Sequence, residues 1–383
     1  MSRRLLRLVC TAAVAAGALL APSPAVAVPD PAPEAGAAVA EPGQRSAASL
    51  LTDLQRLYRD TERATEKYNA TAEKLKKQRA EVTRLDTGLA KARLSLHDSR
   101  GAAGRLARQQ YQSSGEISSY VRLLLARDPQ HALDEGHLIG QLSLERAETV
   151  QRVAGSEKKT DALARAARKA LDGQLALAER QKKERDDVRK RLDGVERLLA
   201  SLTVDQLAEL DKFEKSGAAE AQKKFMASGA LSSERPPSRE GAEALRYAVR
   251  QIGKPYAWGA EGPKSYDCSG LTSQAWQRAG HPVPRTSQEQ WAELPRIPLS
   301  ELRPGDLVVY FPEATHVALY AGDGMVVQAP RPGAKIKVSP IAANPLLGAV
   351  RPDPGEKPLR HYTPPRLPQG ATDGSSQGYS SAP

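Results

Sequence analysis

The sequence predicts an α+β domain near the C-terminal end of the chain, preceded by a long helical hairpin. Apolar side chains repeat every seven residues through positions 54–96, the spacing of helices that pack along one another as a coiled coil. From Gly241 the composition becomes mixed, and all three tryptophans fall at positions 258, 276 and 291. This clustering predicts a compact core of about 110 residues, which we place at residues 241–352.

Residues 1–27 have the features of an export signal. Arginines stand at positions 3, 4 and 7, an apolar run follows from Leu8 to Ala21, and Ala25-Val-Ala27 precedes the expected cleavage site. The run is too short to anchor the chain stably in a bilayer. We therefore expect a secreted protein. Arg3-Arg4 also fits twin-arginine export, so the export route stays open.

The net charge of the chain indicates which kind of molecule it binds. The net charge is +11, and loss of three arginines with the signal would leave +8. A basic balance of this size suits an anionic surface such as a cell-wall polymer. Nucleic acid is the other usual partner of a basic protein, but export argues against it, and we expect no nucleic-acid binding.

Residues 46–228 are predicted to form a helical coiled-coil region. The seam is apolar at one heptad position, whereas the companion position starts with Leu51 and Tyr58 and then turns polar. Glycine, serine and Asp128-Pro interrupt the pattern between 101 and 134, and a second helical arm is predicted from about 132 to 225. Two such arms would fold into a rod, which serves either as a spacer or as a regulator or localiser.

Three segments lack a periodic apolar pattern. Residues 28–45 are rich in Ala, Pro and Glu and are expected to be a flexible leader. Residues 229–240, with Arg235-Pro-Pro-Ser, are expected to be a linker. Residues 353–383 are rich in Pro, Gly and Ser and are expected to be a disordered tail.

The C-terminal domain is predicted to contain helices followed by an antiparallel sheet. Helices are expected at 245–252 and at 271–280, the second with Asp267 as its N-cap and Gly280 as its stop. The expected strands are 307–311, 316–320, 325–329 and 335–338, with Gly322-Asp-Gly as a hairpin turn.

Cys268 is the candidate nucleophile. The other cysteine, Cys10, lies in the export signal, so the exported chain would carry one thiol without a disulfide partner. Exported proteins tend to pair their cysteines or lack them, which suggests reactivity, although a free cysteine can also be a small buried hydrophobe. Cys268 lies in the first turn of its helix, where the helix dipole and unpaired N–H groups favour the thiolate.

Five sequence blocks resemble the NlpC (NlpC/p60) family of cell-wall cysteine peptidases in both order and spacing. They are Pro255-Tyr-x-Trp-Gly, Asp267-Cys-Ser-Gly-Leu, Arg285-Thr-Ser-Gln-Glu-Gln, Pro304-Gly-Asp-Leu-Val and His316-Val-Ala-Leu-Tyr-Ala-Gly. The resemblance covers about residues 241–352, under a third of the chain. It implies a papain-like fold, in which His316 is the general base that pairs with Cys268 as thiolate and imidazolium.

The resemblance also implies roles for five further residues. Gln328 stands where the family often has a second histidine. Its carbonyl oxygen can still accept the imidazole N–H, although it can also be a strand residue without a role. Tyr256 and the backbone N–H of Cys268 would hold the oxyanion. Asp267, Ser269 and Ser287 match positions that hold the substrate. No cofactor or metal is expected, because the exported chain would carry one cysteine and no His-x-x-x-His pair, which argues against zinc binding.

The implied activity is hydrolysis of peptidoglycan stem peptides between D-glutamyl and diaminopimelate residues, in a secreted, cell-wall-associated protein. The helical region would receive an activating partner, such as a membrane complex at division or growth sites. Two other functions stay open: an adaptor whose C-terminal domain only binds wall peptides, and an amidase or acyltransferase of the same superfamily. An intact Cys268, His316 and Tyr256 favour the hydrolase.

Overall fold

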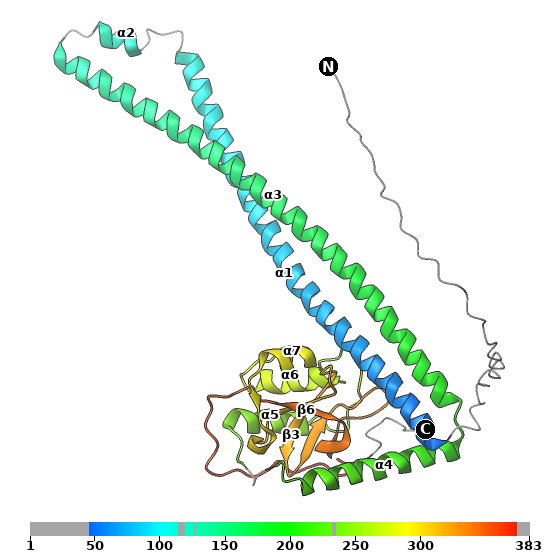
Figure 1. The fold of residues 1–383 in the computed structure, drawn as a ribbon. Helices are drawn as coiled ribbons and strands as arrows, with labels where there is room; N and C mark the ends of the chain where they lie inside the picture. The colour runs from blue at the N-terminus through cyan, green and yellow to red at the C-terminus, as the bar shows by residue number, and fades with distance from the viewer. Residues whose placement is uncertain (1–45, 114–118, 126–127, 232–234, 374–383) are drawn as a thin grey trace, which may run out of the picture. The chain divides into compact units, whose positions relative to one another are not determined.

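The computed structural model describes residues 46–113, 119–125, 128–231 and 235–373 (Figure 1). The expected export signal at 1–27 and leader at 28–45 lie outside these residues, as does the end of the tail, 374–383. Contacts divide the chain into two units, 1–44 and 45–383, and all of the described residues belong to the second.

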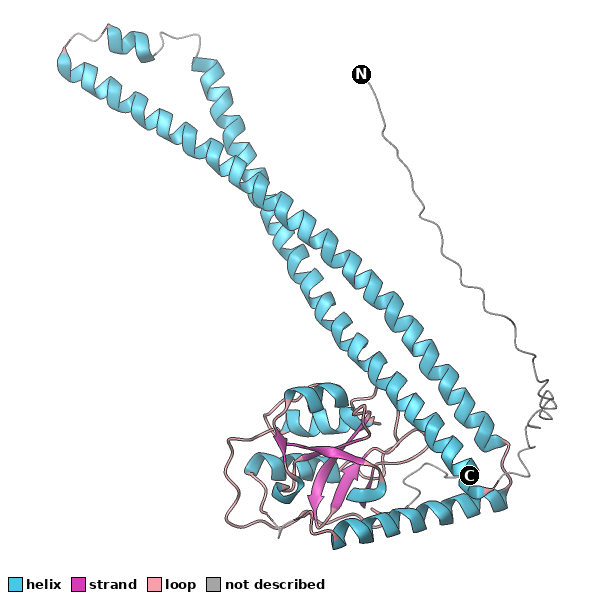
Figure 2. Ribbon diagram, in the orientation of Figure 1, coloured by secondary structure: helices cyan, strands magenta, loops and turns pink. Residues whose placement is uncertain are grey.

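Two long helices pack along each other as an antiparallel pair, which confirms the predicted helical arms (Figure 2). They are α1 (Ala47–Ser113) and α3 (Pro129–Ala200), and the short helix α2 (Ser119–Leu124) lies between them in the chain. Four of the positions that repeat every seven residues from 54 to 96 are buried: Leu54, Thr61, Leu75 and Leu89. None of the helices in the described ranges is both long and apolar enough to cross a bilayer.

The second arm is two helices rather than one. α3 ends at Ala200, and α4 (Val204–Ala227) begins after the N-cap Thr203. Thr203 and Gln206 form a capping box, in which each side chain pairs with the backbone N–H of the other. The sequence signal for this second start is a threonine followed three residues later by a glutamine, and it lies within a stretch whose composition is otherwise helical.

The C-terminal domain has helices beside a six-stranded antiparallel sheet of order β1-β6-β2-β3-β4-β5, which confirms the α+β class. The helices are α5 (Arg239–Val249), α6 (Cys268–Arg278) and α7 (Ser287–Glu293). The strands are β1 (Arg296–Ile297), β2 (Leu307–Tyr310), β3 (His316–Gly322), β4 (Met325–Gln328), β5 (Lys337–Pro340) and β6 (Leu346–Val350). Strands β1 and β6 were not predicted from the sequence.

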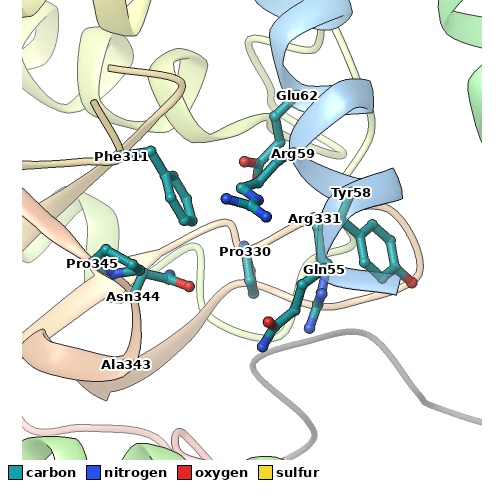
Figure 3. Close-up of a pocket in the computed structure, with 10 residues that line it drawn as sticks. All are labelled: Gln55, Tyr58, Arg59, Glu62, Phe311, Pro330, Arg331, Ala343, Asn344 and Pro345. Atoms are coloured by element: carbon teal, nitrogen blue, oxygen red, sulfur yellow. The ribbon is translucent and has the colours of Figure 1, made fainter. Parts of the chain in front are cut away.

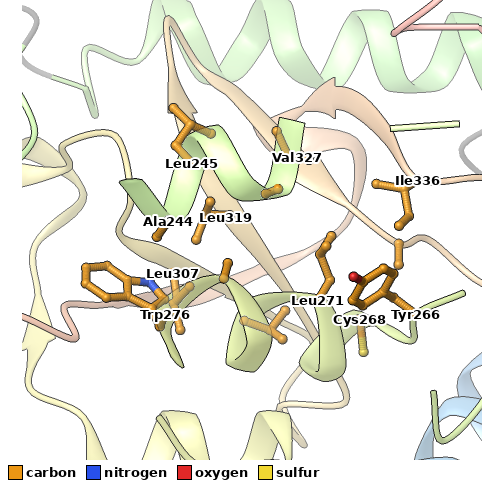
Figure 4. Packing of buried hydrophobic residues seen from close by; sticks show 14 of the residues in the cluster. Ala244, Leu245, Tyr266, Cys268, Leu271, Trp276, Leu307, Leu319, Val327 and Ile336 are labelled. Carbon is orange, nitrogen blue, oxygen red and sulfur yellow. The ribbon is translucent and has the colours of Figure 1, made fainter. Parts of the chain in front are cut away.

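The main core fills the space between the sheet and helices α5 and α6 (Figure 4). Trp276 and Leu271 of α6 are fully buried against Leu307 and Leu319 of the two central strands. Gly270 allows α6 to approach the preceding loop, because a Cβ at this position would overlap the carbonyl oxygen of Ala260. The core therefore fixes the position of the first turn of α6, which contains Cys268.

The C-terminal domain extends beyond both of its predicted boundaries, residues 241 and 352. Ser238, expected in a linker, is fully buried, caps α5 and hydrogen-bonds Asp353. Asp353, expected in a disordered tail, is also paired with Arg303 at 2.9 Å. The backbone N–H of Val338 donates to the carbonyl oxygen of Ala371 at 2.8 Å. Ser238, Asp353 and Ala371 thus attach the two flanking segments to the domain, since the buried polar groups there find their partners in it.

Candidate active site

Cys268 opens helix α6 on the side of the domain where strand β3 begins. Its side chain is only 3% exposed. The predicted N-cap is confirmed, because the side chain of Asp267 accepts a hydrogen bond from the N–H of Gly270 at 2.6 Å. The backbone N–H of Val317 points at the thiol sulfur and favours its ionised form. The thiol therefore lies next to the first residues of β3.

His316 and Gln328 meet at one end of the sheet. His316 is the first residue of β3 and Gln328 the last of β4, and these strands are antiparallel neighbours. The imidazole Nε2 lies 2.7 Å from Oε1 of Gln328, so Nε2–H donates to the amide oxygen. Nδ1 is buried without a hydrogen bond. The pairing fixes the tautomer in which Nδ1 can accept a proton.

Tyr256 is buried beside the same cluster. Its backbone N–H donates to Ala334 at 2.9 Å, which ties the Tyr256 loop to the segment after β4. Burial raises the pKa of its hydroxyl well above the ordinary value, and the nearby Cys268 raises it further. The hydroxyl therefore stays protonated and able to donate a hydrogen bond.

A polar network adjoins Cys268. The Arg285 guanidinium reaches both carboxylate oxygens of Asp267, at 3.1 and 2.7 Å, and the hydroxyl of Ser269 at 2.8 Å. This bidentate pairing gives Arg285 a structural role. The Ser287 hydroxyl donates to Ala314 at 2.7 Å, whereas its backbone N–H faces helix α1. Ser287 thus directs its backbone N–H toward α1, while its hydroxyl is bonded within the domain.

Helix α1 covers this cluster. We call residues 58–69 of α1 the covering segment. The Glu66 carboxylate lies 3.7 Å from the Cys268 sulfur and accepts hydrogen bonds from Ser269 at 2.8 Å and from the Ser287 N–H at 3.0 Å. Oε1 of Glu62 lies 3.5 Å from Nδ1 of His316. Asn69 donates to Asp267 at 3.1 Å.

The covering segment also changes the electrostatics of the site. Burial and then the carboxylate of Glu66 raise the pKa of Cys268 well above its ordinary value. Burial lowers the pKa of His316 to about 4. Both groups are therefore neutral at pH 7 when covered, and the expected thiolate is not favoured. Proximity to the helix N-terminus is outweighed by desolvation, which disfavours both charged forms.

The carboxyl groups of the covering segment are themselves perturbed. Burial raises the pKa of Glu62 to about 8, although the charge of Arg331 opposes the rise. Burial, followed by the neighbouring Asp267, raises the pKa of Glu66. Sequence reasoning missed both residues. The available signal was the run Thr61-Glu-Arg-Ala-Thr-Glu-Lys-Tyr-Asn69, where the apolar seam becomes polar at positions that are nevertheless buried.

The helices packed on an antiparallel sheet, with a buried thiol at a helix N-terminus beside a strand histidine, define a papain-like domain. Residues 253–347 match the NlpC/P60 family, and this C-terminal domain belongs to that family. The match confirms the resemblance seen in the sequence motifs.

The similarity to two known relatives covers less than a third of this chain. A probable endopeptidase of Corynebacterium glutamicum is 40% identical over 116 residues, which are 30% of this chain and 56% of that protein. One from Mycobacterium tuberculosis is 37% identical over 108 residues, 28% of each chain. The chain thus spans about half, or less, of the length of these relatives.

Two solved structures are similar over a comparable share of this chain. The NlpC/p60 domain of the peptidoglycan hydrolase SagA is 32% identical, and the similarity covers 29% of this chain and 97% of that one, with a TM-score of 0.28. RipD of Mycobacterium tuberculosis, described as a non-catalytic NlpC/p60 domain protein adapted to peptidoglycan binding, is 28% identical, with coverage of 30% and 98% and a TM-score of 0.28.

Proposed function

We propose that this protein is an exported peptidoglycan hydrolase, a cysteine endopeptidase that cuts stem peptides between D-glutamyl and diaminopimelate residues. One observation carries the proposal: a buried thiol at a helix N-terminus lies against the first residues of β3, the strand that begins with His316, whose Nε2 is held by Gln328. The probable endopeptidase names of the relatives and the family of the domain support the hydrolytic class.

The geometry supports a thiolate mechanism once the covering segment has left. Nδ1 of His316 takes the proton of Cys268, and the thiolate attacks the carbonyl carbon of the stem peptide. The backbone N–H of Cys268 and the hydroxyl of Tyr256 donate to the developing oxyanion. The imidazolium then protonates the leaving amine, and water, deprotonated by His316, hydrolyses the thioester.

The helical region acts as the regulator in this proposal. Glu66 touches the nucleophile and Glu62 faces the base, so a substrate cannot reach Cys268 until α1 withdraws. A partner that draws α1 away, such as a membrane complex at division or growth sites, would therefore activate the enzyme. A rod that only spaces the domain would need no contact with these two residues.

The bond cut is tested by incubating the chain with purified peptidoglycan and identifying the released fragments by mass. An isolated domain for the same assay should span 235–373, because cuts at 241 and 352 would remove Ser238 and Asp353 from buried hydrogen bonds. Fragments that end in D-glutamate on one side and begin with diaminopimelate on the other are expected. Release of intact stems would instead indicate an amidase.

We expect His316→Ala to slow turnover more than Gln328→Ala does, and Gln328→His to be tolerated. Removing the base removes the proton transfer, whereas an imidazole that has lost its orienting amide still samples the productive tautomer. The measurement is kcat for the three variants on one soluble stem peptide. Equal losses in the two alanine variants would contradict the orienting role of Gln328.

We expect activity of the full chain to rise between pH 6.5 and 8 because the covering segment loosens. The pKa of Glu62 is raised from 4.5 to about 8 when covered, so the covered state binds a proton that the open state has lost. Covering therefore weakens as pH rises through this window, by up to about 1.4 kcal/mol per pH unit. His316, whose pKa falls from 6.5 to about 4, acts oppositely, but only below pH 6.5.

The control for this pH effect is Glu62→Gln/Glu66→Gln, which keeps the size of both side chains but cannot ionise. Its rate should rise less over the same window, leaving only the ordinary titration of the uncovered Cys268 and His316. The same pH profile in the wild-type chain and in this variant would show that the two carboxyl groups do not control covering.

A further inference from the structure

We propose that the catalytic domain carries an anion-binding subsite on the His316 side of Cys268, in which Arg331 receives a carboxylate of the substrate residue that leaves. The inference rests on the proposed endopeptidase function, because it assigns the part of the substrate that lies beyond the cleaved bond.

The subsite is visible as a cavity of about 230 Å³ between helix α1 and the catalytic domain (Figure 3). The wall on the α1 side includes Tyr58, Arg59 and Glu62. The wall on the domain side is apolar at Phe311, Pro330 and Pro345 and polar at Arg331 and Asn344. Withdrawal of α1 would remove the first wall and leave a groove with an apolar floor, one guanidinium and one amide.

Arg331 lies in the segment after β4, and its side chain packs on helices α1 and α4. Its side chain is only 6% exposed, and Nη2 lies 3.7 Å from the carboxylate of Glu214 on α4. The Tyr58 ring of α1 covers the guanidinium face, with the ring centroid 4.1 Å from the guanidinium carbon. The departure of Tyr58 would uncover a preorganised cation, which is the side chain best suited to bind a carboxylate.

The position of Glu62 indicates what the subsite accepts. Glu62 lines the cavity, and the charge of Arg331 lowers the pKa of this carboxyl against the effect of burial. Four residues further along the same helical face, Glu66 places a second carboxyl at Ser269 and Ser287. Helix α1 thus presents one carboxyl to each side of the Cys268–His316 pair.

The chemistry of the reaction identifies the two sides. The imidazolium must deliver its proton to the leaving nitrogen, so the leaving residue lies on the His316 side. Glu62 is the carboxyl on that side, 3.5 Å from Nδ1 of His316. Arg59 departs with α1, which leaves Arg331 as the cation among the cavity-lining residues of the domain. A carboxylate borne on an aliphatic chain fits this groove.

The test uses the full chain opened by Glu62→Lys/Glu66→Lys and two stem peptides that differ only in the leaving residue. One peptide has a free carboxylate there and the other has a primary amide. The opened chain should prefer the carboxylate in kcat/KM by roughly tenfold, the scale of one charge-assisted hydrogen-bonded pair. Arg331→Gln in this background should abolish the preference, so that kcat/KM for the two peptides becomes equal, and thermal unfolding beside the parent chain shows that the variant folds.

Glu214→Gln is the matched control, since it removes the partner of Arg331 on α4 but keeps the guanidinium. It should retain the preference for the carboxylate. An Arg331→Gln variant that still prefers the carboxylate, or that loses both peptides equally, would overturn the subsite.

A binding measurement separates failure of the subsite from failure of the proposed function. The leaving fragment, with either a carboxylate or an amide, is titrated into the opened chain carrying Cys268→Ala. Tighter binding of the carboxylate that disappears in Arg331→Gln supports the subsite even if no peptide is cleaved. Equal affinities for the two fragments would refute it even if both peptides are cleaved.

Discussion

Cys268→Ala, placed in the opened chain that carries Glu62→Lys/Glu66→Lys, should abolish hydrolysis of peptidoglycan and leave the domain folded. The thiol supplies the electron pair that attacks the peptide carbonyl, and the hydroxyls of Ser269 and Ser287 lie in the same cluster. In the opened chain both hydroxyls keep partners within the domain, Arg285 for Ser269 and Ala314 for Ser287. We expect a rate loss of at least about 10³-fold, typical for removal of a nucleophile.

Alanine at this position should cost little stability. The side chain of Cys268 is small and buried at the edge of the main core, so the change removes one sulfur atom. Circular dichroism and thermal unfolding beside the parent chain check the fold. More than a few per cent of the parent activity in a folded variant would exclude the thiolate mechanism and leave the adaptor or another nucleophile.

The catalytic cluster could be predicted from the sequence because its members lie in short motifs with local causes. Asp267 caps α6, which fixes Cys268, and a short hairpin places Gln328 beside His316. The central strands were found because each is a short run of apolar residues. The pair β1 and β6 was missed because β1 has only two residues and β6 contains Gly348, which makes room for the Trp291 ring.

The covering of the site could not be read from the sequence, although regulation by the helices was expected. Glu66 and Cys268 are 202 positions apart, and a heptad pattern does not show which surface the polar stretch of a helix meets. The pKa directions of Cys268 and His316 were missed for the same reason. They depend on burial by a distant helix, whereas the local helix terminus alone would favour the thiolate.

Glu62→Lys/Glu66→Lys in the full chain should increase hydrolysis of a soluble stem peptide by about 10²-fold or more. In the covered state both lysines would be buried, one of them beside the cation Arg331, and burial of a poorly compensated charge costs about 3–5 kcal/mol. In the open state the same residues lie on an exposed helix, where lysine is well tolerated. The changes therefore destabilise only the covered state.

The matched variant is Glu62→Gln/Glu66→Gln, which retains the size and hydrogen-bonding capacity of the two side chains and should remain covered at pH 7. A soluble substrate is required, because it removes any effect of the helices on attachment to the wall. The residue 235–373 domain, if it is stable alone, provides the fully open reference rate. Three equal rates, for the wild-type chain and for the lysine and glutamine variants, would show that the helices space or localise the enzyme without restraining it. A fast lysine variant beside a slow glutamine variant would support restraint by the covering segment, since the variants share the same helix, the same domain and the same catalytic residues and differ in the charge that covering would bury.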